Sequence, residues 1–211
     1  LDPSKGAQVL HFSVPFNAEG VTVMDNWNTL GMRGTGSHSV RLEKVFIPDS
    51  AVTLVRPQGD YHPFWNVVLT VALPLIMGAY VGVAQSAAEI ALTSARSQTK
   101  SKPYLPALVG SMNNTLTTAE LNWRDMIRIA NDLEFGPVDR NAHDIVTRKT
   151  NVAAACIEVM RQAMEIAGGP GFYRTSELER LFRDVPAAHY HPLQHQDQVL
   201  VSGEFLLRQS D

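Results

Sequence analysis

Apolar residues recur at steps of three and four positions through the second two-thirds of the chain, which is the spacing of one face of an α-helix. One series runs from Leu116 to Leu133, and another runs from Val152 to Ile166. The pattern predicts long helices at about residues 67–97, 104–134 and 139–167, with two shorter helices after them. Because long helices with short connections pack as antiparallel bundles, we predict a mainly α fold with a C-terminal antiparallel helical bundle.

The first quarter of the chain has short apolar or alternating runs between turn residues, a pattern typical of strands. The predicted strands are Val9–Val14, Val21–Met24 and Ser39–Phe46. The stretch before the first long helix contains Pro, Gly and Asp and is predicted as a linker. We therefore divide the chain into a partial β-domain at residues 1–56, a linker at 57–63 and a helical bundle domain at 64–211.

The composition is that of an ordinary globular protein, with 45% hydrophobic residues. The formal net charge is −3 and the sequence has no basic run, which argues against nucleic acid as a partner. The single cysteine, Cys156, occupies an apolar helical position, so we expect a core residue and no disulfide framework. A reducing, cytoplasmic location is then the default expectation.

The stretch from Val67 to Ala84 carries no charge and is long enough to raise the question of a membrane span. Pro74, Gly78 and Gly82 interrupt it, and polar residues follow it. We expect a fully buried helix at the centre of the bundle, since such helices are apolar on all sides. The membrane is therefore not expected to be a partner.

Two segments carry a more specific pattern. In the later one, Glu165–Phe172 leads a helix into a glycine turn, and Arg183–Asp184 and the histidine-rich stretch His189–Pro192 follow. The earlier one, Trp27–Val40, contains a Gly-Met-Arg loop and leads into Leu42–Asp49. Together they resemble the acyl-CoA dehydrogenase superfamily over nearly the whole chain, with features of its flavin-dependent monooxygenase branch. The earlier segment resembles the end of the middle β-domain, and the later one resembles the flavin turn of the C-terminal helical domain.

This resemblance implies a flavin cofactor, FAD or alternatively FMN. Gly168, Gly169 and Gly171 match the glycines of the flavin turn, while Gln194 and Gln196 stand where the family places polar contacts to the nucleotide. Glycines allow a ligand to approach closely, and exposed backbone N–H groups at the start of a helix suit a phosphate. The alternative is a plain helix C-cap, which has the same local sequence.

Arg96 resembles the family's arginine that follows the first bundle helix and reaches the pyrophosphate bound by a neighbouring subunit. The alternative is a solvated residue at a helix end. Two departures from the family pattern accompany it. Ser97–Lys100 stands where Phe-Gly is usual, and Glu165 replaces a glutamine, so that its carboxylate would repel a pyrophosphate.

In the acyl-CoA dehydrogenases a glutamate removes the α-proton of the thioester while flavin takes a hydride from the β-carbon. The spacing from Arg183–Asp184 places this glutamate within His191–Gln194, where Pro192 stands, and proline cannot act as a base. Some relatives carry the glutamate on the first bundle helix, where our alignment has Ala72. Both usual bases are therefore absent from this chain.

His191 is the residue that this position offers instead. In the monooxygenase branch a histidine in this loop lies near flavin and substrate and helps to deprotonate the substrate or to support the flavin hydroperoxide, a task that suits a neutral imidazole. The alternative is a surface or interface histidine. A metal site formed with His189 and His195 is disfavoured, because the spacing does not fall on one helical face and Pro192 interrupts it.

Other motif residues have structural interpretations. Adjacent helical residues do not face one another, so Arg183 and Asp184 are each expected to bond elsewhere. Trp27, Met32 and Arg33 are expected on the flavin side of the β-domain, with a core anchor as the alternative for the tryptophan.

The resemblance implies a flavin-dependent oxidoreductase that oxidises a CH–CH bond of a small-molecule substrate such as an acyl-CoA. The alternatives are a two-component monooxygenase that uses reduced flavin and oxygen, and a non-catalytic helical module that only oligomerises. Family members begin with a helical domain and the first half of the β-domain, which this sequence lacks. We therefore expect a C-terminal fragment, inactive alone, that forms a homodimer or homotetramer. The electron-transfer or flavin-reductase partner cannot be identified from the sequence.

Overall fold

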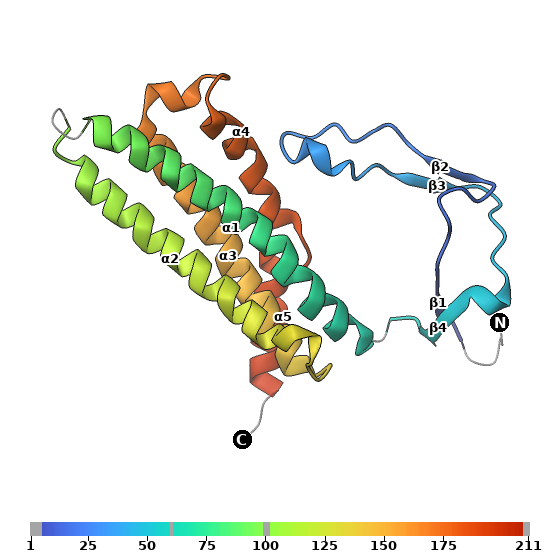
Figure 1. Cartoon of the computed structure of the whole chain (residues 1–211). Helices are drawn as coiled ribbons and strands as arrows, with labels where there is room; N and C mark the ends of the chain where they lie inside the picture. Colours follow the sequence, from blue (N-terminus) through green and yellow to red (C-terminus); the bar gives the residue numbers. More distant parts are fainter. Residues whose placement is uncertain (1–5, 60, 99–101, 209–211) are drawn as a thin grey trace. The chain divides into compact units, whose positions relative to one another are not determined.

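The computed structural model describes residues 6–59, 61–98 and 102–208, and it is mainly helical (Figure 1). Two compact units are present. The described residues within 6–29 and 33–62 form the strand-containing unit, and those within 30–32 and 63–208 form the helical unit.

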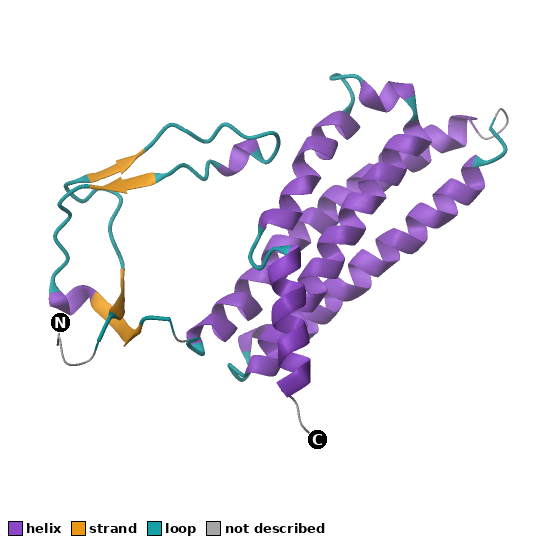
Figure 2. Cartoon of the chain, turned by 180° about the vertical axis from the view of Figure 1, so that it is seen from behind, coloured by secondary structure: helices purple, strands orange, loops and turns teal. Residues whose placement is uncertain are grey.

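The predicted helices are all found in the helical unit. They are α1 (Phe64–Gln98), α2 (Leu105–Ala130), α3 (Asp139–Ala167), α4 (Glu177–Asp184) and α5 (His195–Arg208). Short 3-10 helices connect them: η4 (Asn131–Leu133) follows α2, η5 (Gly169–Phe172) follows α3, and η6 (Val185–Tyr190) follows α4. Figure 2 shows from behind that α1, α2 and α3 run side by side, as expected for an antiparallel bundle.

The second long helix ends earlier than predicted. The sequence predicts a helix to about residue 134, but α2 stops at Ala130. Asn131, Asp132 and Leu133 have φ values of 43°, 50° and 71°. These left-handed conformations end the helix, and an asparagine tolerates this conformation better than most residues.

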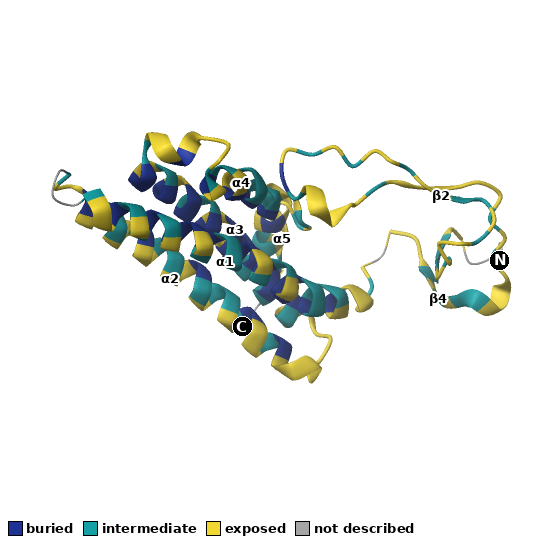
Figure 3. Cartoon of the chain, turned by 45° about the horizontal axis from the view of Figure 1, so that its top comes forward, coloured by how far each residue is buried: buried dark blue, intermediate teal, exposed yellow. Residues whose placement is uncertain are grey.

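The core lies where α3 meets α1 and α2. Figure 3 shows buried residues along α3 and along the faces of α1 and α2 that pack against it. Small side chains let these helices approach closely. Fully buried examples are Ala84, Ala87 and Ala91 of α1 and Ala153 and Ala163 of α3. Cys156 is also completely buried, as predicted, and burial raises the pKa of its thiol to about 12.

The expectation that the first long helix is buried all round is wrong for a single chain. Leu75, near the middle of α1, is 74% exposed, and Phe64, Trp65 and Val67 near its start are exposed too. The physical reason is that α2, α3, α4 and η6, which pack against α1, leave part of its surface uncovered. By length and composition alone, α1 is the one described helix that could cross a membrane, a test that core helices of soluble proteins also pass.

Pro74 interrupts α1, and α2 supplies a contact at this point. The indole Nε1 of Trp123 donates to the carbonyl oxygen of Pro74 at 2.9 Å. Gly78 makes room for the ring, because a Cβ at this position would lie 3.2 Å from Trp123 Cζ2 and Nε1. A proline and a glycine that weaken a helix locally therefore contribute here to the packing of two helices.

The strand-containing unit has two antiparallel pairs. β1 (Gln8–Phe12) pairs with β4 (Val52–Pro57), and β2 (Val21–Val23) pairs with β3 (Val40–Leu42). Within the described residues every strand is thus an edge strand, with open hydrogen-bonding groups on one side.

Two details of this unit differ from the predicted strands. β3 covers only part of the predicted run at 39–46, because Lys44 has a φ of 55° and the extended backbone ends before it. β4 was not among the predicted strands, and its last residue, Pro57, lies in the segment that we predicted as a linker.

Candidate active site

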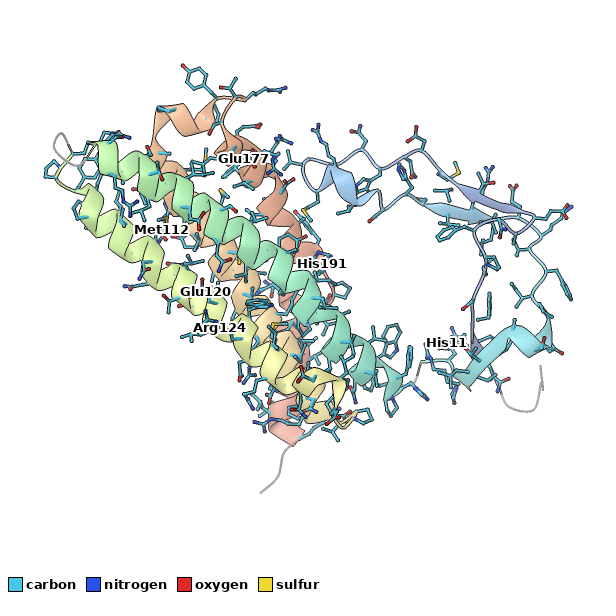
Figure 4. All side chains as sticks on the ribbon, viewed as in Figure 1. His11, Met112, Glu120, Arg124, Glu177 and His191 are labelled. Atoms are coloured by element: carbon cyan, nitrogen blue, oxygen red, sulfur yellow. The ribbon has the colours of Figure 1, made fainter. Side chains whose placement is uncertain are left out.

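His191 lies in the short loop between η6 and α5, with its side chain partly buried. Its ring Nε2 is 2.8 Å from the hydroxyl oxygen of Tyr80, which projects from the middle of α1. The two rings meet edge to face, with centroids 5.5 Å apart. Figure 4 labels His191, whose loop lies beside α1. The predicted residue is therefore anchored against the bundle and is not a solvated loop histidine.

A buried lysine holds the same loop from the other side. Lys149, on α3, is 1% exposed, and its ammonium donates to the carbonyl oxygens of His191 at 2.7 Å and Leu193 at 2.9 Å. These two carbonyl groups flank Pro192. The lysine thus fixes the backbone on both sides of Pro192.

The electrostatic surroundings favour uncharged side chains. Burial, and then the nearby charge of Lys149, lowers the pKa of His191. Burial lowers the pKa of Lys149 itself. Burial, and then the carboxylate of Asp184, raises the pKa of Tyr80, so its phenol keeps its proton. The pair of His191 and Tyr80 is accordingly a neutral imidazole bonded to a neutral phenol near pH 7.

The two sequence motifs meet in the helical unit. The backbone N–H of Met32 donates to Asp184 Oδ1 at 2.6 Å, and Arg183 reaches the carbonyl oxygen of Leu30 at 3.4 Å. A Cβ at Gly31 would lie 1.9 Å from the carbonyl oxygen of Arg183. The glycine is required because backbone packs directly on backbone. As predicted, Arg183 and Asp184 each bond elsewhere and not to one another.

Two backbone N–H groups of the first segment bind a histidine of the same segment. The backbone N–H groups of Asn26 and Trp27 both donate to His38 Nδ1, at 3.1 and 3.0 Å. Trp27 is partly buried and Arg33 is exposed. Their predicted position on the flavin side of the β-domain stays a prediction.

The glycine turn after α3 differs from the predicted geometry. We expected exposed N–H groups at the start of a helix, but the turn leads into η5, and α4 begins only at Glu177. The N–H of Gly168 donates to Met164 at 2.9 Å, and that of Gly171 donates to Gly168 at 3.0 Å. Since these two donors are used within the turn, it offers fewer backbone groups to an anion than the sequence indicates.

The glycines of this turn have different structural roles. Gly168 has a φ of 67°, a conformation that favours glycine. A Cβ at Gly171 would lie 3.1 Å from that of Ala167, so this glycine is needed for packing against α3. A Cβ at Gly169 would meet nothing within 4 Å, so this residue lies on the open side of the turn. Close approach of a ligand is therefore possible at Gly169.

Charges beside the turn suit an anion better than the sequence suggests. Glu165, the departure that was expected to repel a pyrophosphate, is paired with Arg161 at 3.0 Å. Lys102 Nζ lies 4.0 Å from the position of a Cβ at Gly168, and it donates to Gln98 Oε1 at 2.6 Å. A lysine that the sequence motifs did not identify thus supplies positive charge at the turn.

The structure separates the predicted site residues into two groups. Arg96, exposed near the end of α1, lies roughly 24 Å along that helix from Tyr80, given a rise of about 1.5 Å per residue. The glycine turn lies at the end of α3, a similar distance from Lys149. Gln194 and Gln196 belong with the His191 group and are exposed at the start of α5.

Among the residues that the structure describes, no three His, Cys, Asp or Glu side chains are placed to hold a metal ion.

Tyr80, Lys149 and Lys102 are the residues that sequence reasoning missed. Lys149 had a visible signal, because it lies three positions before Val152 on the apolar stripe of α3, where a charge is unusual. Tyr80 lies in an apolar run, and no sequence pattern marks it as a site residue.

Comparison with known proteins places the chain among flavoprotein relatives. The family model "Acyl-CoA dehydrogenase, C-terminal domain" matches residues 75–196. The amino sugar nitrososynthase DnmZ of Streptomyces peucetius is 29% identical over 207 residues, covering 89% of this chain and 48% of the relative. Cyclohex-1-ene-1-carbonyl-CoA dehydrogenase of Syntrophus aciditrophicus is 25% identical over 213 residues, covering 98% and 50%.

A solved structure gives the same result. KijD3 in complex with FMN and dTDP-3-amino-2,3,6-trideoxy-4-keto-3-methyl-D-glucose superposes with a TM-score of 0.80 and 26% identity, covering 94% of this chain and 51% of that one. The chain spans about half the length of the curated relatives it matches. With more than half of its residues matched by the family model and its two motifs joined as described, the chain belongs to the acyl-CoA dehydrogenase C-terminal domain family.

Proposed function

We propose that the whole protein is a flavin-dependent oxidoreductase and that, of the two chemistries found in the family, it catalyses oxygenation. The observation that carries this choice is the neutral imidazole of His191, bonded to Tyr80, in the loop where the dehydrogenases keep a glutamate. Pro192 and Ala72 stand at the two positions of that glutamate. Without a carboxylate at either position, removal of the α-proton of an acyl-CoA has no evident base in this chain.

The residues of the chain fit a flavin nucleotide. The open side of the turn at Gly169 and the ammonium of Lys102 suit the anionic phosphate part, and Glu165 shares Arg161 with Glu158. By the family resemblance, Arg96 would reach the pyrophosphate of a flavin bound by a neighbouring subunit, whereas Gln194 and Gln196 lie with the His191 group, away from the glycine turn. FMN and FAD are both compatible, because KijD3 binds FMN and the family's dehydrogenases use FAD. When bound in its reduced form, the flavin supplies two electrons to dioxygen, so that one oxygen atom enters the substrate and the other leaves as water.

The chain itself provides two side chains, Tyr80 and His191, that can donate and accept a proton. The phenol of Tyr80 can donate to Nε2 of His191 or accept from it, so the ring can adopt either neutral tautomer. In the described part of the chain Nδ1 has no partner, and it can exchange a proton with a substrate N–H or O–H group. Because Tyr80 and Lys149 fix ring and backbone, the group is held in place before a substrate arrives.

The substrate class is proposed at a coarse level. DnmZ is named an amino sugar nitrososynthase, and KijD3 was solved with a dTDP-linked amino sugar. These relatives support a small molecule with an oxidisable heteroatom or activated carbon. Dehydrogenation of an acyl-CoA is the second candidate, favoured by the likeness to the cyclohexene-carbonyl-CoA dehydrogenase.

We extend the proposal to assembly and location. Exposed apolar side chains on α1, among them Leu75, and on α5, among them Leu200 and Leu207, support a homodimer or homotetramer. The single, buried cysteine supports a reducing, cytoplasmic location.

The test compares the two chemistries in the whole protein. Reduced FMN or FAD is supplied anaerobically, oxygen is admitted with a panel of amino sugars, phenols and acyl-CoAs, and product is measured by mass spectrometry. We expect a product that is heavier by one oxygen atom for at least one non-CoA substrate. Bleaching of the oxidised flavin by an acyl-CoA without oxygen, together with an enoyl-CoA product, would establish the dehydrogenase instead.

A further inference from the structure

Lys149 is a buried cation that the packing of the helical bundle does not require. It occupies the apolar stripe of α3 between Ile145 and Val152, both fully buried, and is itself 1% exposed. An ammonium in such a place is unfavourable unless it is paired, and apolar residues of similar size are often neutral or stabilising there. Among the described residues no salt bridge compensates the charge of Lys149. Its partners are two carbonyl oxygens of the His191 loop, at 2.7 and 2.9 Å.

We propose that Lys149 is a positioning residue for His191, which fixes the loop backbone on both sides of Pro192 through its bonds to the carbonyl oxygens of His191 and Leu193. The inference rests on the proposed function in one respect, namely that His191 acts on the substrate. Its physical content, a loop and a ring held by a buried cation, can be measured without flavin or substrate.

Two helices each restrain a different part of the His191 loop. Tyr80 of α1 holds the ring, with its hydroxyl oxygen 2.8 Å from Nε2. Lys149 of α3 holds the main chain, because both of its acceptors are backbone oxygens. Two of the ring's degrees of freedom, its rotation and its displacement with the loop, are thus restricted by separate elements. Loss of one anchor leaves the other in place, so each can be tested alone.

The charges around the ring decide the sign of the effect. Lys149 is the charged group that acts on His191. Lys149 and His195 of α5 act on His189 of η6, and Asp184 of α4 acts on Tyr80. Burial and then Lys149 lower the pKa of His191. A lowered pKa keeps the imidazole neutral at pH values where an ordinary histidine is half protonated, at about 6.5. Removal of the lysine charge must therefore raise the pKa of His191.

The experiment is a histidine titration of the 211-residue chain by NMR, with ¹⁵N-labelled imidazole rings. His191→Asn and His189→Gln assign the two relevant resonances. In the unmodified chain we expect His191 to titrate below about 6.5. In Lys149→Met, which keeps length and apolar volume, we expect the pKa of His191 to rise, because the positive charge beside the ring is removed. The control is Thr150→Val, which alters the neighbouring buried residue, whose hydroxyl bonds Val146 and not the loop.

A His191 pKa at or above its ordinary value in the unmodified chain would overturn the proposal without any variant. So would an unchanged pKa in a folded Lys149→Met chain, or an equal rise in Thr150→Val. If circular dichroism shows that Lys149→Met is unfolded, Lys149→Gln takes its place, because its amide NH₂ group can still donate and the charge is lost.

Activity of the whole protein provides a second readout. Removal of the charge should move the acid limb of kcat/KM to higher pH in Lys149→Gln and leave it in place in Thr150→Val. A lower kcat with an unchanged acid limb would show that Lys149 supports the structure but does not act on His191, and this result would contradict the proposal. Failure of the whole protein to bind flavin would contradict the proposed function and leave the titration result intact, so the two failures can be told apart.

Discussion

A methyl group added at Gly78 should destabilise the protein, whereas the same change one helical turn later, at Gly82, should stabilise it. Both glycines lie inside α1, and neither has a positive φ. A Cβ at Gly82 would meet nothing within 4 Å, but one at Gly78 would lie 3.2 Å from two atoms of the Trp123 ring. The pair therefore separates helix propensity from packing.

The magnitude follows from three contributions. Replacing glycine by alanine inside a helix gains about 1 kcal/mol at either site. At Gly78 the ring of Trp123 must shift, and overpacking of this kind costs roughly 1–3 kcal/mol. The shift also strains the bond from the indole to Pro74, at 2.9 Å, a bond of a kind worth about 1 kcal/mol. Gly78→Ala should thus lower the free energy of unfolding by about 1–3 kcal/mol, and Gly82→Ala should raise it by about 1 kcal/mol.

Urea and thermal unfolding, followed by the far-ultraviolet helical signal, would measure both variants. For a chain of this size 1 kcal/mol corresponds to about 2–4 °C in Tm, so the two variants should differ by at least about 4 °C. Equal stabilisation of both variants would refute the reasoning, because it would mean that the Trp123 ring imposes no constraint on α1.

The other predictions concern the site and the assembly. In the whole protein His191→Ala should lower turnover by roughly 10²–10⁴-fold, the usual contribution of a placed proton-transfer group, while His195→Ala leaves it unchanged; equal turnover in both would remove the role of His191. Gly31→Ala should speed hydrogen exchange of the Met32 amide, because the added carbon separates it from the Asp184 carboxylate, and unaltered exchange relative to the control Gly34→Ala would contradict this. The chain should self-associate through its exposed apolar side chains, and light scattering that reports a monomer across micromolar concentrations would count against it.

Sequence patterns located the helices and the strands β1, β2 and β3, but they missed β4 and the pairing of the strands. The helical pattern is local and repeats over many turns, so α1, α2 and α3 were predicted with errors only at their ends. The end of α2 depends on the left-handed residues that begin at Asn131, which no periodic pattern reveals. Strand pairing is not local, because β1 and β4 pair although more than forty residues separate them in the sequence. The hydroxyl of Thr53, for example, donates to the carbonyl oxygen of His11. A short strand with a distant partner has little signature in one sequence.

The candidate site was only half predictable for the same reason. His191 could be identified, because it stands at a fixed distance from the Arg-Asp motif of the family. Its partners could not, since Tyr80 lies 111 residues away in the sequence and Lys149 lies 42 residues away. Which residues of α1 and α3 face the loop depends on how the two helices pack. The flavin contact of Gly171 stays a prediction, and the structure gives this glycine a packing role against Ala167 as well.

The central claim, that this helical unit belongs to a flavin-dependent oxidoreductase, is tested most directly by the flavin content of the whole protein. The protein should be purified, equilibrated with FAD or FMN in oxidised and reduced form, and separated from free flavin before its visible absorption spectrum is recorded. We predict stoichiometric retention of at least one of these forms, weakened by Lys102→Ala at the glycine turn. Absence of flavin under all four conditions would contradict the account and favour a helical module that only oligomerises.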